Sequence, residues 1–161
     1  MSEEEKFDLR KEYGKLRNKY KDLPSFDDLS KDFEITTIDK EDFLIRRVRR
    51  RINEKVVFFC RILENIIYPS MQNALSAYEA NFFTDDEKQK LSDIHKELMV
   101  IERESIYLDV EASDDEKNIQ FIVKTFKRWE HFKNEIQATV MKMIDTWKNE
   151  QKKEEGERYF G

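Results

Sequence analysis

A chain of 161 residues is long enough to bury a hydrophobic core without disulfides or a structural metal. Charged residues make up 40 %, but 12 Phe, 6 Tyr and 2 Trp exceed what a disordered chain carries, so the charge is expected on solvated helix faces. A net charge of −5 argues against nucleic-acid binding over the whole surface, although it leaves room for one local basic patch.

The scarcity of 3 Gly and 2 Pro favours a few long helices over many β-turns. We predict an all-α fold, an elongated bundle of about four main helices plus one or two short ones, with a long C-terminal helix. The single Cys60 fits a reducing compartment. Because the longest apolar run, residues 56–60, is too short to span a bilayer and the acidic N-terminus is unlike a signal peptide, we predict a cytoplasmic protein without membrane association.

The N-terminal segment is predicted to contain two helices and a connector. Apolar residues recur at helical spacing over residues 4–21, and Pro24 follows the end of that helix. Ser25 can cap a short helix over residues 26–31. Residues 33–38 alternate apolar and polar side chains and are rich in β-branched types, which predicts an extended connector or one lone strand.

A long amphipathic helix is predicted next. The carboxylate of Asp39 can accept from the amides near Asp42, so we place the helix start there and its end at Tyr68, before Pro69. A shorter helix covers residues 71–81. The apolar stripe of the long helix is Leu44, Ile45, Val48, Ile52, Val56, Phe59, Leu63 and Ile66.

Two capping-box patterns, Thr84 with Glu87 and Ser113 with Glu116, predict the starts of two more helices. The first helix carries the stripe Leu91, Ile94, Leu98, Ile101 and Leu108. The stripe of the second steps by three and four like a coiled coil: Ile119, Ile122, Phe126, Trp129, Phe132, Ile136, Val140, Met143 and Trp147.

The last helix, from about residue 114 to about residue 151, would be roughly 55 Å long, more than the width of a compact domain of this size. This length is why we predict an elongated bundle. We predict one domain over residues 1–151, followed by a charged tail over residues 152–161 that ends in aromatic side chains.

The sequence contains no recognisable pattern of a catalytic site. His95 follows Ser92 by three residues and His131 follows Arg128, so neither forms the Glu-x-x-His pattern of a di-metal helical bundle. Cys60 lies in an apolar run, where a thiol is usually a small hydrophobe. No glycine-rich phosphate loop is present. We predict no catalytic residue, metal, cofactor or small-molecule substrate, and an enzyme built from carboxylates is the least favoured hypothesis.

The sharpest local feature is a run of five arginines on the predicted long helix: Arg46, Arg47, Arg49, Arg50 and Arg51. At about 100° per residue they spread over roughly 200° of the helix, opposite the apolar stripe. We interpret them as an outward-facing patch. Such a patch either tracks the phosphates of a nucleic acid, or pairs with carboxylates on neighbouring helices and otherwise remains solvated.

The C-terminal Tyr159 and Phe160 follow a charged spacer and are candidates for docking to a partner, because aromatic residues dominate interface energetics. The alternative is that they fold back or fray. The near-heptad stripe of the last helix could likewise pair with a second copy, although such a stripe is more often an intramolecular core.

Over residues 39–104, an Arg-rich helix precedes a Thr-capped helix that ends in Glu102-Arg103. This order is similar to the helical domain of archaeal GINS replication subunits. The sequence has no counterpart of the β domain that those proteins usually carry, so we transfer neither function nor site residues.

We therefore predict a non-enzymatic interaction, adaptor or assembly-subunit protein that binds a protein partner or forms homo-oligomers. The alternative is a nucleic-acid-associated protein that uses the five arginines.

Overall fold

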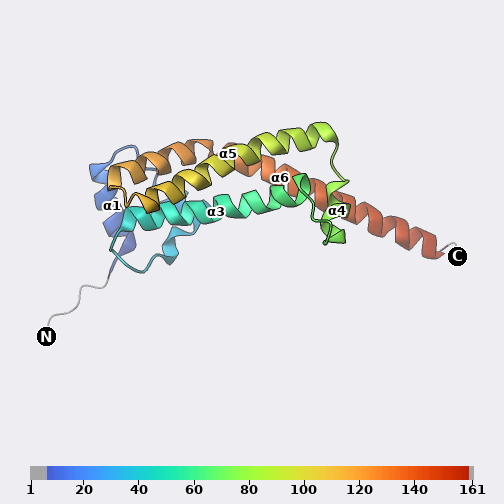
Figure 1. The fold of residues 1–161 in the computed structure, drawn as a ribbon. Helices are drawn as coiled ribbons and strands as arrows, with labels where there is room; N and C mark the ends of the chain where they lie inside the picture. Colours follow the sequence, from blue (N-terminus) through green and yellow to red (C-terminus); the bar gives the residue numbers. More distant parts are fainter. Residues whose placement is uncertain (1–6, 160–161) are drawn as a thin grey trace. The chain divides into compact units, whose positions relative to one another are not determined.

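The computed structural model describes residues 7–159, and all regular elements in this range are helices (Figure 1). The elements of this range are α1 (Leu9–Lys19), α2 (Phe26–Phe33), the 3₁₀-helix η1 (Ile35–Thr37), α3 (Leu44–Ile67), α4 (Ala74–Ala80), α5 (Asp85–Val110) and α6 (Asp115–Tyr159). The predicted all-α fold with a long C-terminal helix is confirmed.

Contacts gather into two compact units. Unit 1 contains residues 7–58 and Leu98–Arg128, and unit 2 contains Phe59–Glu97 and residues 129–159. Helices α3, α5 and α6 each contribute one segment to unit 1 and one to unit 2. The prediction of a single domain over residues 1–151 stays a prediction.

Unit 1 is a helical bundle in which α1 and α2 are joined by a fixed turn. The hydroxyl of the buried Tyr13 donates to the carbonyl of Pro24 at 2.8 Å. The side chain of Ser25 accepts from the amide of Asp28 at 3.1 Å, which confirms the predicted cap. Apolar residues from every helix of the unit form its core, among them Leu29, Phe33, Ile35, Ile45, Val48, Ile52, Leu98, Ile119 and Ile122.

Unit 2 packs around stacked aromatic rings. The rings of Phe59 and Trp129 lie parallel with centroids 4.8 Å apart. The second tryptophan, Trp147, lies against Tyr78 and donates its indole N–H to Glu79 at 2.8 Å. Around these rings the unit buries the apolar side chains of Cys60, Leu63, Ile66, Leu91, Ile94, Phe132 and Ile136.

The predicted extended segment over residues 33–38 is wrong, because these residues close a helix and form η1. Glu34 adopts a left-handed conformation with φ 54°, which turns the chain after α2. The amide of Ile38 then donates to the carbonyl of Ile35 at 3.0 Å. Because Phe33 and Ile35 are both buried, the apolar residues that suggested a strand fill the core of unit 1.

The start of α3 lies later than predicted. Asp39 does not cap this helix, because residues 38–43 are irregular and Phe43 is left-handed with φ 55°. Helical backbone begins only at Leu44. The predicted end before Pro69 and the whole apolar stripe of α3 are confirmed.

Of the two predicted capping boxes, one is confirmed. The Thr84 amide donates to Glu87 at 2.8 Å, and the Glu87 amide donates to the Thr84 hydroxyl at 3.2 Å. At the start of α6, Asp114 is the cap and accepts from the Lys117 amide at 3.0 Å. The hydroxyl of Ser113 instead donates to the carbonyl of Leu108 at the end of α5.

Helix α6 extends beyond its predicted end near residue 151 and reaches Tyr159. Residues 151–159 are all exposed. This segment holds no apolar stripe, so only its charged, helix-favouring composition signals that the helix continues.

Candidate functional site

The five arginines do not share one environment. Arg49 is 0 % exposed, so the expectation that all five face outward is wrong for this residue. Seven residues separate Arg49 from the buried Val56, which places the two side chains only about 20° apart on the helix. This small angle was the sequence signal for the burial of Arg49, because it places Arg49 at the border of the apolar stripe.

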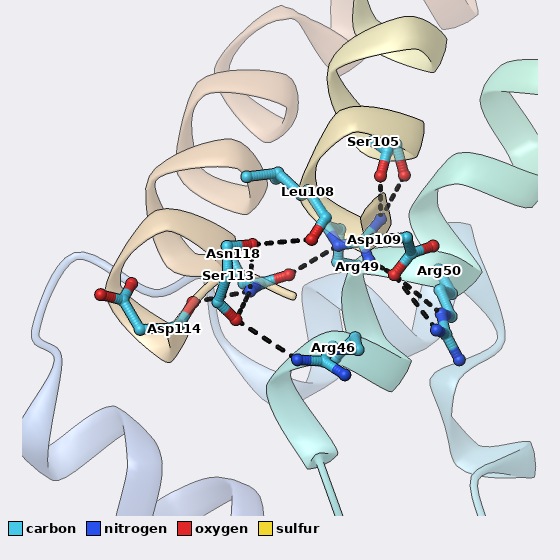
Figure 2. Close-up of polar contacts among 9 residues, drawn as sticks. All are labelled: Arg46, Arg49, Arg50, Ser105, Leu108, Asp109, Ser113, Asp114 and Asn118. Carbon is cyan, nitrogen blue, oxygen red and sulfur yellow. Dashed lines mark hydrogen bonds and ion pairs between the residues drawn. The ribbon is translucent and has the colours of Figure 1, made fainter. Parts of the chain in front are cut away.

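The guanidinium of Arg49 is held by α5 and α6 (Figure 2). Its Nε donates to Asn118 Oδ1 at 2.6 Å, and its Nη1 donates to the carbonyl of Ser105 at 2.8 Å and to the hydroxyl of that residue. Its Nη2 pairs with Asp109. Because every nitrogen of the buried guanidinium has an acceptor, Arg49 ties α3 to α5 and α6 within unit 1.

Asn118 extends this network into the turn between α5 and α6. Its amide nitrogen donates to the carbonyl of Asp114 at 2.6 Å and to the carbonyl of Ser113 at 3.3 Å. The latter carbonyl also accepts from Arg46 at 3.3 Å. The residues that begin α6 are thereby tied to α3.

The electrostatics of this network follow from burial and charge pairing. Burial lowers the pKa of the Arg49 guanidinium, while Asp109 acts to raise it. Partial burial acts to raise the pKa of Asp109, but hydrogen bonds from Arg50 and Arg49 together outweigh it and hold this pKa below its usual range. Because its pKa is held low, Asp109 is ionised at neutral pH.

The other four arginines are partly or fully exposed. Arg50 Nη2 pairs with Asp109 at 3.1 Å, and Arg51 pairs with Glu54 at 2.8 Å. Among residues 7–159, Arg46 and Arg47 form no ion pair; Arg47 Nε donates to the backbone carbonyl of Asp42 at 2.7 Å. The run therefore divides into one buried anchor, two arginines paired with carboxylates and two without carboxylate partners.

The predicted docking residues lie at the end of α6. Tyr159 is 90 % exposed, and Phe160 lies outside the described residues. Their role in docking stays a prediction.

A groove that the sequence analysis missed lies in unit 1, between the end of α5 and the start of α6. It has a volume of about 720 Å³. Val100 and Tyr107 line it and are 56 % and 62 % exposed, while Leu108 and Phe121 are buried beside them. The signal was a set of apolar residues on α5 outside its core stripe, since Val100 and Tyr107 are seven residues apart and share a face.

Two ion pairs bridge the helices along this groove. Lys117 on α6 pairs with Glu111, the residue that directly follows α5, at 2.6 Å, and Lys124 pairs with Glu104 at 2.9 Å. Glu104 belongs to α5, Glu111 to the turn after it and both lysines to α6, and Tyr107 lies between the two glutamates along the chain. The groove therefore has an apolar centre, an acidic row on the α5 side and a basic row on the α6 side.

Over residues 7–159, no group of three or more His, Cys, Asp or Glu is placed to hold a metal ion. The buried His95 lies with its Nε2 3.1 Å from Glu64 Oε1, and Cys60 is buried in the core of unit 2. No helix within that range is both long and apolar enough to cross a membrane.

No protein-family model, curated protein or solved structure matches this chain. The resemblance to GINS subunits therefore remains a similarity in the order of elements.

Proposed function

We propose that the chain is a non-enzymatic interaction protein or assembly subunit of the cytoplasm, and that it binds another protein chain through the α5/α6 groove of unit 1. The carrying observation is the exposed apolar centre of this groove, at Val100 and Tyr107. Large apolar side chains that remain exposed together mark interaction surfaces, because covering them removes apolar area from water.

Neighbouring residues support this assignment. The charged side chains around the apolar centre give it the polar rim that protein interfaces usually have. The buried thiol of Cys60 is compatible with a reducing compartment.

Site-specific cross-linking tests the proposal. A photoreactive phenylalanine analogue replaces Tyr107 in the full chain, and a matched variant carries it in place of Met141, which is exposed on α6 in unit 2. Irradiation in cells that express the chain is expected to give a covalent protein adduct from position 107 and none from position 141. No adduct at 107, or equal adducts from both positions, overturns the proposal.

Tyr159 and Phe160 remain a second proposed docking element. Deleting residues 158–161 is expected to leave the melting temperature unchanged, because residues 151–159 are exposed, while any partner held by the aromatic end is lost. A clear drop in melting temperature would show that the deleted residues stabilise the fold and would count against docking.

A nucleic-acid-associated function is the second candidate, favoured by the lack of ion pairs between Arg46 or Arg47 and any carboxylate of residues 7–159. If these arginines contact phosphates, binding to DNA or RNA weakens steeply with salt, and Arg46→Glu with Arg47→Glu abolishes it. Lys96→Glu, at an exposed position in unit 2, is the control. Absence of binding at low salt overturns this candidate.

A further inference from the structure

We propose that the occupant of the α5/α6 groove is a second copy of this chain, packed so that α5 of each copy lies over α6 of the other. The inference rests on the proposed interaction function and names its partner. It depends on how the charges around the groove are distributed.

The two charged rows run along opposite sides of the groove. Glu104 on α5 and Glu111 just after it form the acidic row, on a side that Arg103 also lines, and Lys117 and Lys124 form the basic row on α6. The side chains of all four are at least 31 % exposed, so each pair presents charge to whatever covers the groove. A partner that fits this surface needs a basic row over α5, an acidic row over α6 and an apolar strip between them.

The groove of a second copy provides this arrangement of charges. A two-fold axis lying in the interface and parallel to the helices exchanges the lateral positions of α5 and α6. The acidic row of one copy then faces the basic row of the other, and the two Tyr107 side chains meet at the apolar centre. Such an isologous contact needs only one self-complementary patch.

The other face-to-face two-fold arrangement is unfavourable. An axis lying in the interface but perpendicular to the helices places α5 over α5 and α6 over α6. Glu104 then faces Glu111 of the other copy and Lys124 faces Lys117, so both rows repel. Charge therefore selects the arrangement in which α5 lies over α6.

Two half-exchanged variants, each with the charges of one row reversed, test whether the occupant is a second copy. One carries Glu104→Lys and Glu111→Lys, so both rows are basic; the other carries Lys117→Glu and Lys124→Glu, so both are acidic. Each alone is expected to sediment as a monomer, while the wild type forms a dimer of twice 19.6 kDa. An equimolar mixture of the two variants forms a heterodimer. A monomeric wild type, or no complex in the mixture, overturns the inference.

A fully exchanged variant with all four substitutions tests the arrangement and controls for folding, because it keeps the net charge and restores both intrachain ion pairs in reverse. It is expected to dimerise alone but to exchange poorly with wild type, since acidic would face acidic and basic would face basic. Native mass spectrometry of a mixture with isotope-labelled wild type should give heterodimers at least about tenfold weaker than either homodimer. Preferred heterodimers would indicate that α5 lies over α5 and overturn the arrangement.

The matched control exchanges the charges of Asp93 and Lys96, an exposed ion pair in unit 2, and should leave dimerisation unchanged. The cross-linking experiment separates the two proposals. An adduct at position 107 of twice the chain mass supports both. An adduct with a different protein and a monomeric wild type leaves the interaction function standing and removes the self-association.

Discussion

At the level of single residues, Arg49 is the side chain on which the packing of unit 1 depends. Taking a charge out of water costs several kcal/mol, and only a complete set of acceptors offsets that cost. Ser105, Asp109 and Asn118 supply the set. A buried ion pair adds little net stability over an apolar substitute, but removing one partner leaves the other uncompensated.

Asp109→Ala is therefore expected to lower the free energy of unfolding by about 3 kcal/mol, because it leaves the buried Arg49 guanidinium without its counter-charge. Urea denaturation followed by circular dichroism measures this. The control is Glu54→Ala, which removes the more exposed partner of Arg51 and should cost less than about 1 kcal/mol. Equal losses in the two variants would contradict the anchoring role of Arg49.

Acidification should remove the contribution of Asp109 to this network, because it protonates the carboxylate. Hydrogen bonds hold the pKa of Asp109 below its usual range, so its contribution to stability is complete above the unfolded-state pKa of about 3.9 and is lost as the pH falls through the lower folded-state value. The stability advantage of wild type over Asp109→Asn should be constant above about pH 5 and shrink below about pH 4. An advantage that grows on acidification would have the wrong sign.

At the level of helices, the sequence predicted what apolar periodicity determines. The stripes of α3 and α5 are buried as expected, and Thr84 with Glu87 caps α5. Helix starts were predicted less well, because a polar side chain beside a helix has several bonding choices. Ser113 could have capped α6 but instead closes α5.

The candidate site was predicted only in part, for a related reason. The arginines were visible as a run, but the burial of Arg49 depends on acceptors more than fifty residues away along the chain. The groove depends on which apolar residues of α5 stay uncovered after packing. Neither feature follows from periodicity in one segment.

The turn that ends α5 leads to another prediction. Ala112 is left-handed with φ 51°, and its amide donates to the carbonyl of Asp109 while the Ser113 amide donates to that of Leu108. This position usually holds glycine, since a side chain there costs roughly 1–2 kcal/mol.

Ala112→Gly should therefore raise the free energy of unfolding by about 1 kcal/mol in thermal or urea denaturation. Ala138→Gly, at an exposed position inside α6, is the matched control and should lower it by a similar amount. A loss of stability in both variants would mean that the left-handed turn contributes no strain.

At the level of the whole molecule, self-association couples stability to concentration. If two copies cover the groove, the melting temperature rises with protein concentration, because folded chains dimerise and unfolded chains do not. Tyr107→Glu should remove this dependence, since it places a charge at the apolar centre. Scanning calorimetry over a hundredfold concentration range measures both. A concentration-independent melting temperature in the wild type would contradict dimerisation in that range.

The distribution of indole rings adds a spectroscopic consequence. Both tryptophans of the chain, Trp129 and Trp147, belong to unit 2, so tryptophan fluorescence, excited selectively over tyrosine, reports on that unit alone. Far-ultraviolet circular dichroism records the helices of both units. Overlaying the two melting curves thus asks whether this chain unfolds as one cooperative body: coincident curves indicate a single transition, and separated curves assign each step to its unit without introducing a label.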